Sequence, residues 1–163
     1  MDTIKLSEVI GQEILELRFQ YVPETEYGLQ SFHAYLKLSS DTIIGIPELD
    51  DNEYLNLTQG NLDYFNKMFN TGQIVRDNLN SYFVGQKIID FYFRYNNDEL
   101  DFGESAFIKL ANGYYLTEKN FGPMGLTNID LQILDEVHFQ KELKRLNSIG
   151  IDVRSFTKTK NAC

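Results

Sequence analysis

The sequence predicts an α+β fold made of two similar halves, each an antiparallel β-meander followed by a helix, packed with pseudo-twofold symmetry. Three observations support this prediction: a segment near the N-terminus recurs 74 residues later, apolar and polar residues alternate in several short stretches, and two stretches carry apolar residues at helical spacing. No Gly-, Ser- or Pro-rich linker separates the halves. We therefore expect a single domain over residues 1–156, with half one at about 3–72 and half two at about 76–156.

The repeat consists of two blocks that occur in the same order in both halves. Residues 7–21 align with residues 81–95, and six of these fifteen positions are identical. The identical pairs are Ser7/Ser81, Gly11/Gly85, Gln12/Gln86, Ile14/Ile88, Phe19/Phe93 and Tyr21/Tyr95. Residues 34–38 align with residues 106–110 at an offset of 72. Two blocks in the same order, at nearly the same offset, indicate an internal duplication.

The first half begins with a short helical turn that Ser7 can cap and that Gly11 ends, because a left-handed residue is expected one turn later. A strand follows whose apolar face comprises Leu15, Leu17, Phe19 and Tyr21. Such alternation is typical of a half-buried antiparallel strand. Further strands are expected at residues 32–38 and 42–46, and the apolar spacing predicts a helix over residues 61–70.

The second half repeats this order and extends it. Its first strand has an apolar face comprising Ile89, Phe91, Phe93 and Tyr95. The elements expected after it are strands at residues 106–110, 114–118 and 129–134, a helix at 136–147 and a strand at 151–156. Asn112 and Gly113 form a strong hairpin signal, and Asp135 is a suitable N-cap for the helix. Residues 157–163 are expected to form a flexible polar tail.

The charge balance limits the classes of partner. The 163 residues include 24 acidic and 15 basic residues, a formal net charge of −9. Nucleic acids and anionic membranes attract cations, so this balance argues against both as partners. The charge is uneven, because residues 1–136 carry 9 basic and 22 acidic residues whereas residues 137–163 carry 6 basic and 2 acidic residues. Since no signal peptide or membrane-length apolar run is present, we expect a cytoplasmic protein.

The sequence contains no recognisable catalytic or metal-binding motif. His33 and His138 are the only histidines, and neither has the spacing of a metal site. Cys163 is the only cysteine, so a disulfide within the chain is excluded. Gly-rich phosphate-binding loops and nucleophile elbows do not occur. We therefore expect no cofactor, no metal and no enzymatic activity.

Acidic residues cluster in segments that are expected to join strands. One cluster is Glu48, Asp50, Asp51 and Glu53, and the other is Asp98, Glu99, Asp101 and Glu104. A segment with two Gly and one Pro, of the kind that forms binding loops, carries Phe121 and Met124. We interpret these residues as the partner-binding surface of a non-catalytic, acidic protein-interaction module. Such a module would be of the inhibitor or immunity type and would bind a basic partner such as a bacterial toxin.

Two other functions remain open. A small-molecule-binding or oligomerising module is the first alternative, with a pocket at the seam between the repeats that Tyr21 and Tyr95 frame. A homo-oligomer is compatible with this alternative. An enzyme of an unfamiliar type, using His33 or clustered carboxylates as acid or base, is the second. Three aromatic residues lie on strand faces that point away from the predicted core: Tyr35, Tyr92 and Phe107. Either the two helices cover these residues, or the residues form an exposed aromatic patch.

Overall fold

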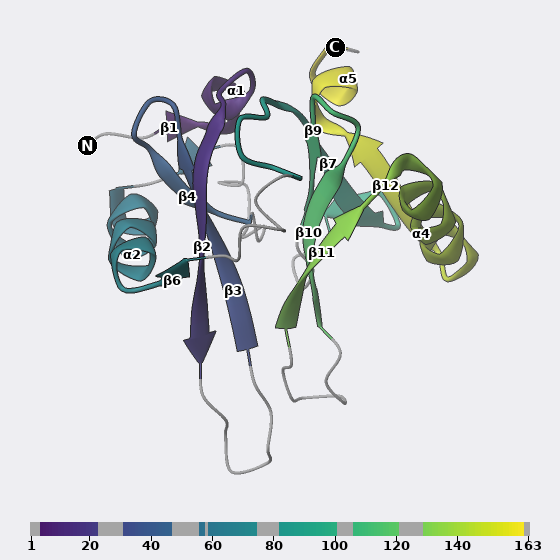
Figure 1. Cartoon of the computed structure of the whole chain (residues 1–163). Coiled ribbons are helices and arrows are strands. Elements are labelled where there is room, and N and C mark those ends of the chain that lie inside the picture. The colour runs from purple at the N-terminus through teal and green to yellow at the C-terminus, as the bar shows by residue number, and fades with distance from the viewer. Residues whose placement is uncertain are drawn as a thin grey trace.

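Two antiparallel β-sheets face each other, and one helix covers the outer face of each sheet (Figure 1). The computed structural model describes residues 4–22, 31–46, 56–57, 59–74, 82–100, 106–120 and 129–161. Because it combines helices with antiparallel sheets, the protein is α+β, as the sequence predicts.

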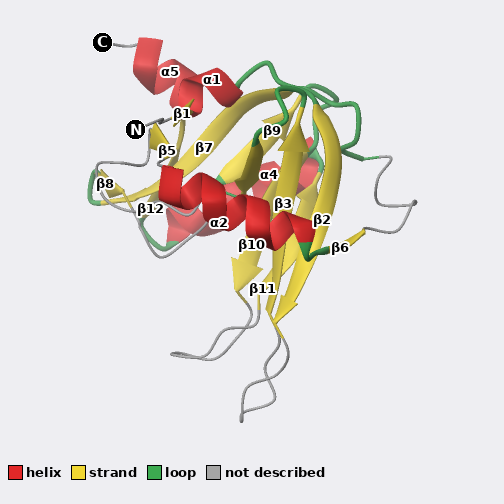
Figure 2. Ribbon diagram, turned by 90° about the vertical axis from the view of Figure 1, so that its left-hand side faces the viewer, coloured by secondary structure: helices red, strands yellow, loops and turns green. Residues whose placement is uncertain are grey.

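The first sheet has the strand order β4-β3-β2-β6. Its strands are β2 (Ile14–Val22), β3 (Ser31–Leu38), β4 (Ile43–Gly45) and β6 (Gln73–Ile74). Helix α2 (Gln59–Asn70) lies across the outer face of this sheet (Figure 2). A separate two-stranded ladder pairs β1 (Ile4–Lys5) with β5 (Asn56–Leu57).

The second sheet has the strand order β11-β10-β9-β7-β12, and β8 pairs with the end of β7. Its strands are β7 (Ile88–Asn96), β8 (Glu99–Leu100), β9 (Phe107–Leu110), β10 (Tyr115–Asn120), β11 (Ile129–Leu134) and β12 (Ile151–Ser155). Helix α4 (Glu136–Ser148) covers the outer face of this sheet (Figure 1). The short helices α1 (Leu6–Val9) and α5 (Phe156–Asn161) lie at one end of the sheets.

The chain follows the same path through both sheets. Three strands form an antiparallel meander in each sheet: β2-β3-β4 in the first and β7-β9-β10 in the second. A helix follows, and the strand after that helix, β6 or β12, pairs with the free side of the first strand of the meander. The second sheet has two additional strands: β8, which pairs with the end of β7, and β11, which pairs with β10 before α4 begins.

Side chains from both sheets fill the space between them. The most deeply buried of these side chains, none more than 1% exposed, include Ile14, Leu17, Leu36, Ile88, Phe91, Phe93 and Ile108. The rings of Phe91 and Phe93 stack with their centroids 6.3 Å apart. Burying a large apolar side chain contributes about 1.5–3 kcal/mol to stability. This shared core therefore holds the two sheets together.

The helices cover aromatic residues on the outer faces of both sheets. This is the first of the two arrangements expected for the outward-facing aromatic residues. On the first sheet, Tyr35 is 4% exposed and packs against Phe65 and Phe69 of α2. On the second, Phe107 is fully buried, and its ring centroid lies 5.2 Å from that of Phe139 in α4. Each sheet therefore buries aromatic side chains on its outer face as well as apolar ones on its inner face, which explains why large aromatic residues alternate with inward-facing ones along the strands.

A reciprocal set of hydrogen bonds joins the two copies of the repeated block. Gly11 N donates to Ile88 O (2.7 Å), and Gly85 N donates to Ile14 O (2.8 Å). In the return direction, the amides of Ile14 and Ile88 donate at 2.9 Å to the carbonyls of Gln86 and Gln12, respectively. Both glycines adopt left-handed backbone angles, with φ of 92° at Gly11 and 83° at Gly85, which confirms the prediction for these corners.

The assignment of Leu15 and Ile89 to the buried face is wrong. Leu15 is 45% exposed and Ile89 is 39% exposed, whereas the preceding residues, Ile14 and Ile88, are fully buried. The pairing register shifts between Ile14 and Glu16 in β2 and at the equivalent place, between Ile88 and Asp90, in β7. A β-bulge inserts one residue, so the residue at the bulge faces solvent and the alternation restarts after it.

Two helix ends differ from the predictions. Ser7 lies inside α1, and Lys5 is the N-cap; the Lys5 amide donates to the Glu8 carboxylate at 2.7 Å. Where a polar tail was expected, α5 continues the chain through Asn161. Its first turn is capped by Ser155, whose Oγ accepts a hydrogen bond from the Lys158 amide at 3.2 Å.

Candidate functional site

The β7–β8 hairpin contains the part of the predicted acidic surface that the structure describes. Asn97 and Asp98 form its two-residue turn, with φ of 52° and 62°, a geometry that suits Asn and Asp. The Asp98 side chain is 87% exposed, and its carboxylate accepts a hydrogen bond from Arg154 Nη2. Glu99 is also exposed. This end of the sheet therefore presents two carboxylates, one of which is paired with a cation of the same chain.

Arg154 organises the surface beside that hairpin. Its Nε donates to Asp152 Oδ2 at 2.8 Å, and its guanidinium carbon lies 4.3 Å from the ring centre of Tyr95. The hydrogen bonds to Asp152 and then Asp98 raise the pKa of Arg154, so its cation persists at all physiological pH values. Tyr95, one of the two residues expected to frame a ligand pocket, is half-buried and packs against the core between the sheets.

The other predicted site residues lie outside the described part of the chain. These are Glu48, Asp50, Asp51, Glu53, Asp101, Glu104, Phe121 and Met124. Tyr21 lies in β2 opposite Phe32, and its side chain is outside what the structure describes. The structure therefore brings together only Asp98, Glu99 and Tyr95 among the predicted residues, through the pairing of β7 with β8.

The described residues, which we call the framework, carry none of the net charge of the protein. The described residues include 14 of the 24 acidic and 14 of the 15 basic residues, so their formal charges cancel. The remaining segments hold 10 acidic residues and a single basic one, Arg76, which accounts for the whole net charge of −9. Most of these segments connect elements of the two sheets, among them residues 23–30, 47–55 and 101–105. The sequence alone shows the excess of acidic residues, but not that nearly all of it lies in segments that connect helices and strands.

A hydrogen-bonded carboxylate fixes the start of α4 on the second sheet. Tyr115 Oη donates to Glu136 Oε2 at 2.6 Å, and Gln140 Nε2 donates to Glu136 Oε1 at 2.9 Å. The hydrogen bond from Tyr115 is the largest cause of a lowered pKa of Glu136. Burial, followed by the contact with Glu136, raises the pKa of Tyr115. Tyr115 is therefore a permanently protonated donor with a structural role, and not a general base at neutral pH.

A cavity of about 270 Å³ lies between α4 and the outer face of the second sheet. Its lining comes from β7, β9, β10, β11 and α4, and it includes the buried Arg94 and the exposed Lys141. The guanidinium carbon of Arg94 lies 4.7 Å from the ring centre of Phe107. Sequence reasoning missed this site because residues from five elements form it; the only local signal was that two charged residues, Asp90 and Arg94, share the outward face of β7.

Of the two histidines, the structure describes the side chain of His138 only. His138 is exposed, and its Nδ1 lies 2.6 Å from Asp135 Oδ1, the carboxylate that caps α4. His33 lies in β3 opposite Gln20. Over the described ranges, no group of three or more His, Cys, Asp or Glu side chains is arranged to hold a metal ion.

Comparisons with known proteins add no relative. No protein-family model, curated protein or solved structure matches the chain. None of the helices in the described segments has the length and apolar character needed to cross a membrane.

Proposed function

We propose that the protein is a non-catalytic, acidic protein-interaction module of the inhibitor or immunity type, which binds a basic protein such as a bacterial toxin. The observation that carries this proposal is that the formal charges of the described residues cancel, while nearly all of the net negative charge lies in the segments that connect them.

An acidic excess in the connecting segments suits recognition of a partner better than it suits stability of the fold. Like charges held close together repel one another and do not stabilise a fold, so a concentrated acidic excess calls for a benefit other than stability. Opposite charge on a partner speeds diffusional encounter and disfavours partners of the wrong sign. Residues 47–55 and 101–105, which contain six of the eight predicted acidic contacts, are the segments we expect to meet the partner.

We also infer that residues 1–156 form one unit that arose by duplication and that its halves are related by a pseudo-twofold axis. The reciprocal hydrogen bonds at Gly11 and Gly85 support this inference, as do the equivalent bulges in β2 and β7 and the common chain path through both sheets. Each half follows its first long strand with an acidic stretch: Glu24 and Glu26 after β2, and Asp98 to Glu104 after β7. Duplication would thus give each half an acidic stretch after its first long strand.

Isolation of the protein with its partner tests the proposal. The full chain, tagged in its native host, is purified at low salt, and stoichiometric companions are identified by mass spectrometry. We expect one basic protein that high salt releases, because salt screens exposed charges over about 10 Å at ~0.1 M. A companion without basic excess, or a homodimer with no companion, would contradict the proposal, and a homodimer would favour the oligomerising module.

A matched pair of variants shows whether the connecting segments matter. Asp50→Asn with Asp51→Asn removes two charges from residues 47–55, and Asp41→Asn with Asp63→Asn removes two exposed charges from the framework. Both double variants change the net charge equally. We expect only the first to lower recovery of the companion.

A further inference from the structure

We propose that the cavity between α4 and the second sheet is a binding site for a small organic anion, a carboxylate or phosphate attached to a compact apolar body. Its described lining residues come from the strands of the second sheet and from α4, and the site lies on the outer face of that sheet. Its volume, about 270 Å³, is just below the range of ~300–1,000 Å³ that is typical of pockets for drug-sized ligands. This size suits a metabolite with a single ring or a short chain.

The lining is cationic although the protein is acidic. Three basic residues, Arg94, Lys141 and Arg145, line the cavity together with one acidic residue, Glu142, so its formal charge is +2 in a chain of net charge −9. Glu142 is engaged within the lining, since its Oε2 accepts from Arg145 Nε at 3.0 Å and its Oε1 from Arg145 Nη2 at 2.5 Å. An anion entering the cavity therefore meets a lining whose formal charge is positive.

The floor of the cavity presents a guanidinium in a fixed position. Arg94 is only 6% exposed, and its guanidinium stacks over Phe107, which is fully buried. A buried guanidinium that lies over a ring has little freedom to reorient, and its planar donor fork matches the geometry of carboxylate and phosphate groups. Thr117, which is 3% exposed, donates its hydroxyl proton to the Ala106 carbonyl at 3.0 Å and so forms part of a rigid wall. A floor that does not rearrange on binding lowers the entropic cost of association.

The remaining walls fit the apolar part of such a ligand. Leu134 contributes apolar surface, and Gln132 adds an amide that can donate or accept a hydrogen bond. Lys141, on α4, is exposed and supplies a second positive charge to the lining. The arrangement of one buried planar cation, one flexible cation and an apolar wall is that of an organic anion site, not of a metal or sugar site.

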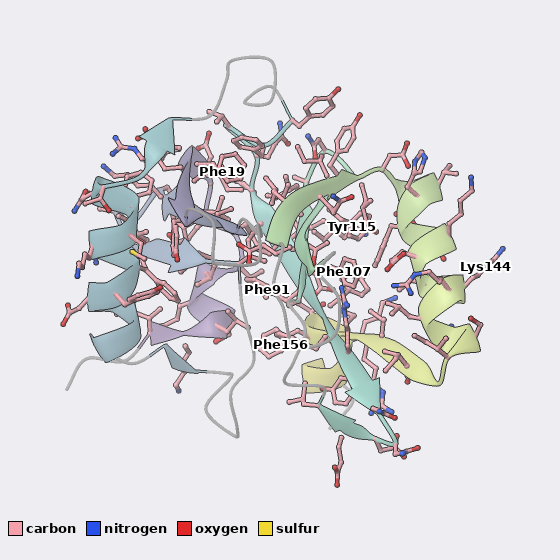
Figure 3. The ribbon with its side chains drawn as sticks, turned by 90° about the horizontal axis from the view of Figure 1, so that it is seen from below. Phe19, Phe91, Phe107, Tyr115, Lys144 and Phe156 are labelled. Carbon is pink, nitrogen blue, oxygen red and sulfur yellow. The ribbon has the colours of Figure 1, made fainter. Side chains whose placement is uncertain are left out.

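Two lysines of α4 provide a matched test of location. Lys141 lines the cavity, whereas Lys144 points away from the sheet (Figure 3). Both residues are exposed and lie in the middle of the same helix, so replacing either with Ala removes the same charge at a similar cost to the helix. A difference in ligand affinity between these variants therefore reports the site and not the overall charge.

The experiment measures binding of benzoate and phenyl phosphate to the full chain by calorimetry and thermal unfolding, with benzyl alcohol as the neutral analogue and inorganic phosphate as the headgroup alone. At about 100 times Kd, a ligand selective for the native state raises Tm by ~5–10 °C in a protein of this size. We expect this shift with at least one organic anion and a weaker shift with benzyl alcohol. The stronger of the two anions then identifies the headgroup class.

The variants decide whether the shift comes from this cavity. We expect Lys141→Ala to weaken Kd by about 2- to 5-fold and Lys144→Ala to leave it unchanged. Arg94→Met should weaken binding further, and the lysine pair decides the matter if that variant fails to fold. The proposal is overturned if neither organic anion binds, if benzyl alcohol binds as well as the anions, or if the two lysine variants behave alike.

Discussion

Replacement of the glycines at the junction between the repeated blocks should destabilise the protein through backbone strain alone. Gly11 has φ of 92°, and a Cβ built on it has no atom within 4 Å. Gly85 has φ of 83°, and the nearest atom to its Cβ is Glu13 Oε1 at 3.7 Å, an ordinary contact. No side-chain clash therefore contributes. An L-residue forced into the left-handed region costs roughly 1–2 kcal/mol, and more when it is β-branched.

We therefore expect Gly11→Val and Gly85→Val each to lower the free energy of unfolding by about 2 kcal/mol, which corresponds to ~4–8 °C in Tm. Gly11→Asn is the control, because Asn tolerates positive φ better than Val does and should cost clearly less. Each glycine amide donates a hydrogen bond to the other copy of the block. The losses of unfolding free energy caused by the two Val substitutions should therefore not be additive.

Urea and thermal unfolding of the parent, the single variants and the double variant measure these differences. Val variants that unfold at the parental midpoint would refute the assignment of strained corners. An Asn variant as unstable as the Val variant would show that something other than φ sets the cost.

Three further substitutions test how the layers are joined. Phe139→Ala should lower the free energy of unfolding by about 3–5 kcal/mol, because the buried ring packs on three aromatic rings of the second sheet; a loss below ~1 kcal/mol in urea unfolding would contradict this packing. Tyr115→Phe should remove about 1 kcal/mol at neutral pH by deleting the donor to exposed Glu136. Because the Tyr115 hydroxyl lowers the pKa of Glu136, this stabilisation is present above the unfolded-state pKa of Glu136 and is lost as the pH falls. The free energies of unfolding of parent and variant should therefore converge below ~pH 4. A difference that does not change with pH would contradict the mechanism. Glu118→Ala should cost roughly 1–3 kcal/mol, since the buried Glu118 carboxylate accepts from the Ala34 amide (2.8 Å) in the opposite sheet, and equal stability by thermal unfolding would argue against this link.

Local patterns in the sequence predict the main elements because those elements are determined by local chemistry. The strand at residues 129–134 and the helix that Asp135 caps follow from alternation, helical spacing and a capping side chain, all of which lie within a few residues of one another. The left-handed glycines follow from the repeat, since two equivalent glycines at a turn share a single explanation.

The errors arise where distant residues decide the outcome. Leu15 and Ile89 continue the apolar alternation, yet the bulges that expose them depend on pairing with another strand. The first turn of α5 depends on Asp90, which lies 67 residues before Thr157 in the sequence. The Asp90 carboxylate accepts hydrogen bonds from the Thr157 amide at 3.1 Å and from the Ser155 hydroxyl. No local pattern contains this information.

The same limit applies to the candidate sites. The acidic excess is a property of composition, but its concentration in the connecting segments is visible only when the residues that form the helices and strands are known. The cavity under α4 is built by Arg94, Phe107 and residues of three further elements, and neighbours in the sequence do not indicate that they meet.

The dependence of the association rate on ionic strength tests the central claim most directly. Once the companion protein is isolated, its association rate constant with the full chain is measured by stopped flow from low to high salt, beside the Asp50→Asn, Asp51→Asn double variant. The account predicts a rate that falls steeply with salt, with a shallower slope for the variant, because exposed opposite charges accelerate encounter. A rate that is independent of salt, or a variant that matches the parent at every salt concentration, would contradict the claim that the acidic connecting segments recognise a basic partner.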